Sequence, residues 1–170
     1  MSFLNKIRLA LNSFFEKLTV LIVIAMVIVV FAQVFFRYVL HNSLSWSEEL
    51  AIFLFIWLTF IGGEIVLRNG GHIAVDALLN ALKGIPKLVL SIFIDVVIIV
   101  FACIVLASGI ELTISTVNQP SAALNVSMSW VYAAIPVSMT MMIINTFYSF
   151  ITKLIVRPAH TLMDNVSVDE

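Results

Sequence analysis

The chain has 170 residues, of which 62% are hydrophobic and 11% are charged, and its formal net charge is −1. Soluble domains carry about 25% charged residues, so this composition and a mean hydropathy of +1.13 predict a membrane protein. The balanced charge also argues against binding to nucleic acid, which requires a clustered basic surface.

Apolar segments long enough to cross a bilayer recur along the chain. A hydrocarbon core of about 30 Å takes roughly 20 helical residues. We predict four spans, at residues 18–36, 50–67, 88–110 and 128–151, in one membrane domain that covers residues 1–170. The first span is longer than the apolar part of a signal peptide, so we expect it to remain in the mature protein. Pro136 predicts a kink in the fourth span, because it cannot donate a hydrogen bond to the carbonyl of Tyr132.

The distribution of basic residues predicts that both termini lie in the cytoplasm. Lys and Arg concentrate in the short cytoplasmic loops of membrane proteins. With the N-terminus inside, eight of the 9 basic residues fall in cytoplasmic segments, including the tail at 152–170, and Arg37 falls outside. The predicted fold class is therefore an all-α integral membrane protein with four transmembrane helices and cytoplasmic termini.

Two further segments have the pattern of amphipathic helices that lie along a membrane surface. In residues 1–17, apolar residues recur at helical spacing. The opposite side of that segment carries Asn5, Arg8, Asn12 and Glu16. Residues 73–83 carry a similar polar stripe, which begins near Asp76. The alternative is that each segment simply extends its neighbouring span.

The sequence contains no recognisable catalytic, cofactor or metal site. Cys103 is the single cysteine, so no thiol–disulfide pair can form within the chain. The 3 histidines fall in predicted loops or tails, away from positions that would ligate a membrane haem. No histidine or cysteine pair has metal-ligand spacing. We therefore expect neither an enzyme nor a need for a cofactor or metal.

Glu64 and Asp95 fall inside predicted spans, where ionisable residues are costly and often functional. One hypothesis is that they couple transport to an ion. The alternative is structural, because Arg68 follows Glu64 at the spacing that favours an ion pair on one helix. Asp95 lies about 12 Å along the helix from Lys87, so it needs a partner on another helix or in water.

Small and aromatic residues indicate possible contacts between helices and the outer boundary of the membrane. Gly62 and Gly63 would let another helix approach the second span closely, or would weaken the end of that helix. Trp46, Trp130 and Tyr132 lie near the predicted outer boundary, where aromatic residues form belts.

The order of several motifs resembles one protein family. Arg37-Tyr38 closes the first span, and the second span runs from "WSEEL" at 46–50 to "FLFIWLTFIGG" at 53–63. Arg68 then precedes "GHIAVD" at 71–76. This order resembles the small membrane subunit of tripartite ATP-independent periplasmic (TRAP) transporters, the DctQ-type chains. The first half matches closely, whereas the second half matches in size, number of spans and the proline of "KGIPK".

The resemblance implies a sodium-driven importer of an organic acid in the bacterial inner membrane. In such transporters a periplasmic binding protein captures the substrate and a large membrane subunit carries it. This chain would pack against the large subunit and enlarge its fixed scaffold within the lipid. The positions matched by motif, with structural or subunit-contact roles, are Arg37, Trp46, Glu48, Glu49, Trp57, Arg68, His72 and Asp76. Gly63 departs from the alanine that is common there in the family.

Two other functions remain open. One is a self-sufficient, ion-coupled four-helix transporter of the small multidrug type, although such proteins use a membrane glutamate in the first helix, and residues 18–36 contain none. The other is an accessory or assembly subunit of a different membrane complex. For the substrate, overall likeness favours sialic acid over a C4-dicarboxylate, although no single residue decides between them.

Overall fold

The computed structural model describes residues 2–42, 44–69 and 85–166. Within these ranges the helices are α1 (Ser2–Tyr38), α2 (Ser45–Arg68), α4 (Ile85–Ser115), α5 (Met128–Tyr132) and α6 (Ala134–Val166). Four helical segments in the described part are long and apolar enough to cross a membrane. The predicted all-α fold with four membrane-crossing helices is confirmed. The predicted surface helix at 73–83 lies outside the described residues.

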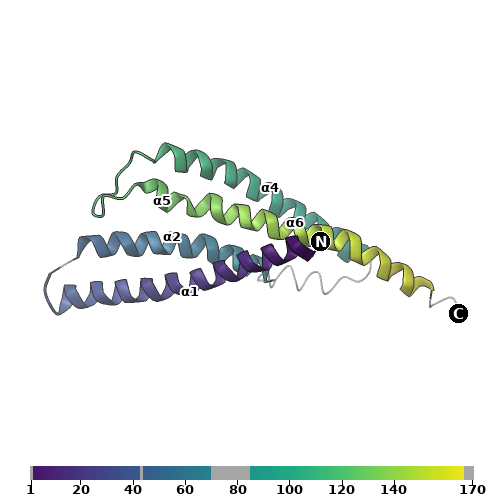
Figure 1. Ribbon diagram of the computed structural model, residues 1–170, viewed down its shortest axis with the longest axis horizontal. Helices are drawn as coiled ribbons and strands as arrows, with labels where there is room; N and C mark the ends of the chain where they lie inside the picture. Colours follow the sequence, from purple (N-terminus) through teal and green to yellow (C-terminus); the bar gives the residue numbers. More distant parts are fainter. Residues whose placement is uncertain (1, 43, 70–84, 167–170) are drawn as a thin grey trace.

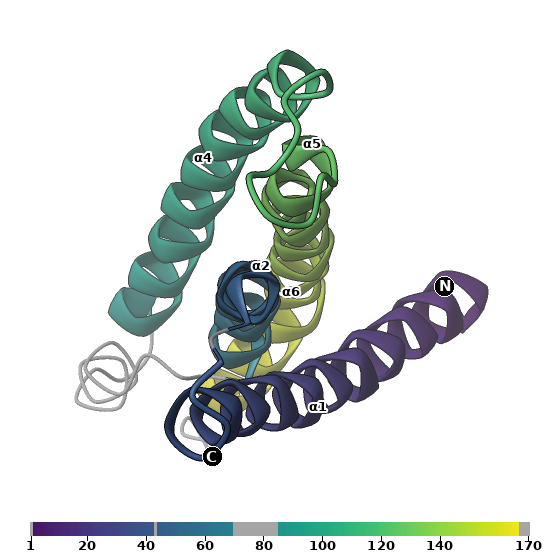
Figure 2. The ribbon, with the colours of Figure 1, turned by 90° about the vertical axis from the view of Figure 1, so that its left-hand side faces the viewer.

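The helices form an open row in the order α1, α2, α6, α4 (Figures 1 and 2). α1 packs along α2, α2 packs on α6, and α6 packs on α4. Residues 39–42 and the connection 116–127 lie at one end of the long helices, which we call the loop end (Figure 1). The N-terminus and the end of α2 lie toward the opposite, terminal end (Figure 1). The first and last described residues therefore lie toward the same end of the long helices.

α1 is one unbroken helix of 37 residues, about 55 Å at 1.5 Å per residue. It contains no glycine or proline, so nothing in the sequence interrupts it at the predicted boundary near residue 18. Its polar stripe contacts α2 and α6, whereas Ile7 and Phe14 are exposed. The amphipathic pattern of the first segment thus places polar groups between helices and apolar groups outside.

The last membrane segment divides near the predicted kink. α5 ends at Tyr132 and α6 begins at Ala134, so Pro136 lies in the first turn of α6. A proline is tolerated in a first turn because the N–H that it lacks has no partner there. Backbone hydrogen bonds from Ala133 to Ser129 and from Val137 to Ala133 keep the two helices nearly continuous.

Among the described helices, α4 and α6 share the most extensive packing. Ala102, Met139 and Met142 form a buried apolar cluster there. At Gly109, an added Cβ atom would lie 2.6 Å from Cγ2 of Ile135, so only glycine permits this approach of α4 and α6. The outer faces of α1 and α4 carry exposed apolar side chains, as expected for surfaces that contact lipid or another membrane protein.

Candidate functional site

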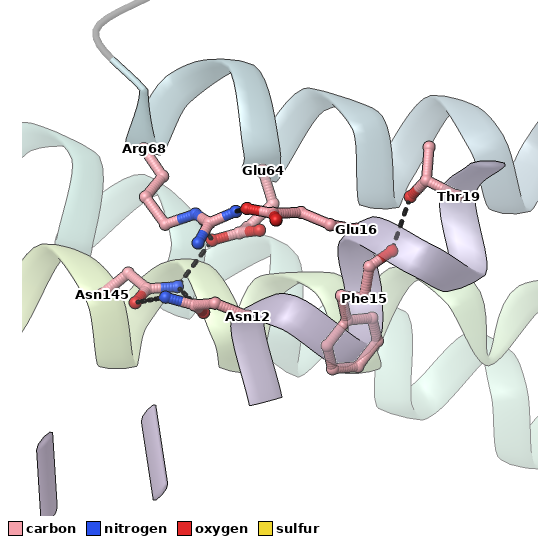
Figure 3. A network of polar contacts seen from close by, with 7 residues as sticks. All are labelled: Asn12, Phe15, Glu16, Thr19, Glu64, Arg68 and Asn145. Atoms are coloured by element: carbon pink, nitrogen blue, oxygen red, sulfur yellow. Dashed lines mark hydrogen bonds and ion pairs between the residues drawn. The ribbon is translucent and has the colours of Figure 1, made fainter. Parts of the chain in front are cut away.

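A group of polar side chains joins α1, α2 and α6 toward the terminal end (Figure 3). Asn12 of α1 and Asn145 of α6 exchange two hydrogen bonds, of 3.1 and 3.0 Å, in which each side-chain amide donates to the other. Asn145 Nδ2 also donates to Oε1 of Glu64 on α2 at 2.6 Å. All three side chains are buried, and Glu64 is only 3% exposed. Together with Glu16 and Arg68 they form what we call the polar cluster.

Arg68 holds the charged part of the polar cluster. Its Nη2 lies 2.7 Å from Oε1 of Glu16 on α1, and its Nε lies 3.7 Å from Oε1 of Glu64. The predicted pair of Glu64 and Arg68 on one helix is therefore present, but the shorter ionic contact of Arg68 crosses to another helix. The guanidinium lies between two carboxylates and links α1 to α2.

The arrangement of the polar cluster is suited to holding helices together. A carboxylate within a membrane bundle is costly unless cations or hydrogen-bond donors surround it. Among the described residues, Arg68 is the cation beside Glu64 and Asn145 is the hydrogen-bond donor to it. The sequence placed Asn12 and Glu16 on a polar stripe but did not single out Asn145. The available signal was an amide side chain within an uncharged span.

Asp95 finds its partner on α6. Nζ of Lys153 lies 2.7 Å from Oδ2 of Asp95, which is 6% exposed. The two residues are 58 positions apart in sequence. Sequence reasoning required a partner for Asp95 but did not identify Lys153, which lies two residues beyond the predicted fourth span. This ion pair links α4 to α6, the last two helices in the row.

At the loop end, Glu49 fixes the connection between α4 and α5. Its carboxylate accepts hydrogen bonds from the backbone N–H groups of Ala122, Ala123 and Leu124, at 3.0, 2.9 and 2.7 Å. A second link joins the same regions, because Nε1 of Trp57 donates to the backbone oxygen of Trp130 at 3.2 Å. Glu49 and Trp57 on α2 thus position the 116–127 connection and the start of α5.

Other candidate residues are not brought together. Arg37, Trp46 and Glu48 are exposed at the loop end. An added Cβ at Gly62 or Gly63 would meet nothing within 4 Å in the described part of the chain. Among the three glycines of the described residues, Gly109 is the one that lies close to another helix. His72 and Asp76 lie outside the described residues. Within the described ranges, no three His, Cys, Asp or Glu side chains are grouped to hold a metal ion.

Comparison with known proteins identifies the family. Residues 26–155 match the family described as tripartite ATP-independent periplasmic transporters, DctQ component. The sialic acid TRAP transporter small permease protein SiaQ of Vibrio cholerae is 30% identical over 142 residues, which cover 82% of this chain and 81% of SiaQ.

Two longer relatives also match. The sialic acid TRAP transporter permease protein SiaT of Haemophilus influenzae is 31% identical over 141 residues, 81% of this chain but 21% of SiaT. The isethionate TRAP transporter permease protein DctMQ of Oleidesulfovibrio alaskensis is 28% identical over 141 residues, 78% of this chain and 22% of DctMQ. The chain therefore spans about a fifth of the length of these two proteins. It is a multi-pass protein of the bacterial inner membrane and belongs to the DctQ family of small TRAP transporter permease subunits.

Proposed function

We propose that this chain is the fixed scaffold subunit of a sodium-driven TRAP transporter that imports an organic acid. It packs against a large membrane subunit, which carries the substrate and the ions. A periplasmic binding protein delivers the substrate to the complex. In this proposal the chain neither binds substrate nor moves during transport.

The observation that carries the proposal is how the chain uses its carboxylates within the spans. Glu64 is bound by Asn145 and Arg68, and Asp95 is bound by Lys153. Transporters that hold a substrate near the middle of the membrane usually build the site from interrupted helices. In the described spans, the interruption at Ala133 lies near the loop end, beside Pro136, and not at the polar cluster.

Two observations support packing against a larger partner. The outer faces of α1 and α4 leave apolar side chains exposed, including Phe31 at 73% and Ile104 at 63%. In addition, SiaT and DctMQ resemble this chain over only 21% and 22% of their lengths. A unit of this kind therefore occurs as part of a longer permease protein. An accessory role in an unrelated complex has no such support.

For the substrate, we propose an organic acid and favour sialic acid. The sialic acid proteins SiaT and SiaQ each match at least 81% of this chain. A C4-dicarboxylate TRAP transporter small permease protein, DctQ of Vibrio cholerae, is 34% identical but over only 56 residues. The isethionate protein DctMQ also matches 78% of this chain, so the support is stronger for an organic acid in general than for sialic acid in particular.

We further propose that the terminal end faces the cytoplasm. The charge distribution favours this orientation. Reporter fusions after Asn42 and after Gln119 are then expected to be periplasmic, and a C-terminal fusion cytoplasmic. A cytoplasmic result for the fusion after Asn42 would reverse the orientation.

Reconstitution tests the scaffold function directly. The chain is placed in vesicles alone, or with its large subunit and binding protein, and uptake of sialic acid is measured under an inward sodium gradient. We expect uptake only from the complete set. Uptake by the isolated chain would instead favour the self-sufficient transporter. A cross-link from α2 to the large subunit that forms in just one transport state would show that the chain is not fixed.

A further inference from the structure

An arginine–tyrosine pair lies just beyond the polar cluster. The guanidinium carbon of Arg8 on α1 lies 3.6 Å from the ring centroid of Tyr148 on α6. Arg8 precedes Asn12 by four residues, about 6 Å along α1, and Tyr148 follows Asn145 by about 4.5 Å along α6. The pair is therefore about one helical turn closer to the terminal end than the buried amides. Figure 1 shows that α1 and α6 both extend past the end of α2 in this region.

Arg8 keeps much of its hydrogen-bonding capacity unused. Its Nη2 donates to Oδ1 of Asn5 at 3.2 Å. Its Nε, which neighbouring atoms cover, has no hydrogen-bond partner in the described part of the chain, and the same is true of Nε of Arg68. Within the described ranges, no carboxylate lies within 4.0 Å of its guanidinium. Arg68 and Lys153 differ, since each lies 2.7 Å from a carboxylate oxygen. The charge of Arg8 is thus not neutralised by any described side chain.

The position and geometry of Arg8 suit one kind of anion. A guanidinium is planar and binds phosphate through two parallel N–H groups. Stacking on an aromatic ring fixes the plane of that group. Just beyond the apolar part of a membrane helix, the phosphate groups of lipids are the abundant anions. We propose that Arg8, oriented by Tyr148 and Asn5, binds the phosphate of an anionic phospholipid at the bilayer surface nearest the N-terminus.

Lys6 provides a matched control. It is exposed on the same helix, two residues from Arg8, and carries the same charge at nearly the same depth. Two residues along an α-helix correspond to a rotation of about 200°, so Lys6 points away from Tyr148. General attraction between basic residues and anionic lipid affects both positions equally, whereas a binding site involves only Arg8. The proposal is independent of the transport role.

The experiment measures lipid binding to the purified full-length chain by native mass spectrometry. Phosphatidylglycerol is titrated against phosphatidylcholine, and inorganic phosphate is added in a separate arm. We expect a preference for phosphatidylglycerol that Arg8→Gln weakens roughly thirty-fold, since charge-assisted hydrogen bonds are lost. Lys6→Gln removes only general attraction and is expected to weaken binding about fivefold or less. Tyr148→Leu is expected to weaken it about threefold.

Several outcomes would overturn the proposal. Equal losses from Arg8→Gln and Lys6→Gln would indicate general attraction without a site. Equal binding of phosphatidylglycerol and phosphatidylcholine would contradict recognition of an anionic headgroup. Displacement of the lipid by millimolar inorganic phosphate would assign the site to free phosphate. If Arg8→Gln does not fold, Arg8→Lys serves in its place, since it keeps the charge but loses the paired N–H groups and should also weaken binding.

Discussion

The loop end and the terminal end of the helices are held together by different kinds of contact. At the loop end, the carboxylate of Glu49 accepts hydrogen bonds from three consecutive backbone N–H groups and thereby sets the shape of a connection. At the terminal end, side chains bond to side chains, and Asn145 joins Asn12 and Glu64 from two other helices. Loss of the loop-end contacts is expected to disturb only the 116–127 connection. The terminal-end contacts, in contrast, determine how α1, α2 and α6 are aligned.

The largest effect is expected at the terminal end, from Asn145→Leu. This change leaves Glu64 without its hydrogen-bond donor and Asn12 without its partner, while both remain buried. We expect the free energy of unfolding to fall by about 2 kcal/mol, given the measured range for hydrogen bonds in membrane bundles and for those to charged groups. Reversible unfolding in mixed micelles measures the change.

Thr140→Val is the control for this change, because the Thr140 hydroxyl donates to the Pro136 carbonyl of its own helix and is exposed. We expect little loss there. Equal losses in the two variants would mean that the polar cluster contributes nothing specific to helix alignment.

At the loop end, Glu49→Gln is expected to act locally. The neutral amide accepts hydrogen bonds more weakly than the carboxylate. We therefore expect the backbone amides of Ala122, Ala123 and Leu124 to exchange with solvent roughly tenfold faster or more. Hydrogen exchange with mass spectrometry measures this, while amides around Asn145 should be unchanged.

Glu48→Gln is the matched control, since Glu48 is exposed one residue away. A rise in exchange that spread along α2 to the polar cluster would show that the two ends are coupled, contrary to the local role of Glu49.

The smallest effect is expected for the Glu16–Arg68 ion pair. The side chain of Glu16 is 51% exposed, so solvent weakens the attraction. A double-mutant cycle with Glu16→Gln and Arg68→Gln should give a coupling free energy below about 1 kcal/mol that falls further in high salt. A larger coupling free energy that does not change with salt concentration would show that this ion pair is shielded from solvent, as the buried contacts are.

Much of the fold follows from hydropathy alone. Residues 18–36, 50–67, 88–110 and 128–151 all fall within helices apart from Ala133, and Pro136 marks the region where the last segment divides. The continuity of α1 was harder to predict, because an amphipathic pattern fits both a surface helix and a helix that packs by its polar side. Its polar stripe contacts other helices because the surroundings of a membrane bundle are apolar.

The contacts at the candidate site depend on tertiary structure. Asn145 lies 133 residues from Asn12 and 81 from Glu64, so no local pattern could pair them. The hydrogen bonds from backbone N–H groups to Glu49 were equally unpredictable, because nearly every residue has a backbone N–H and the residue type therefore does not identify the partner. By contrast, Glu64 and Arg68 were predictable because four residues separate them on one helix.

The most direct test of whether the buried carboxylates are structural is a sodium titration of uptake by the complete transporter containing Glu64→Gln. The amide retains an oxygen for Asn145 and removes the charge, and Asp95→Asn makes the equivalent change on α4. With uptake expressed per assembled complex, we expect the sodium concentration for half-maximal uptake to equal that of the unaltered transporter, and any loss to appear in the amount of complex. Normal assembly with a lost or shifted sodium dependence would contradict the structural role and assign ion coupling to this chain.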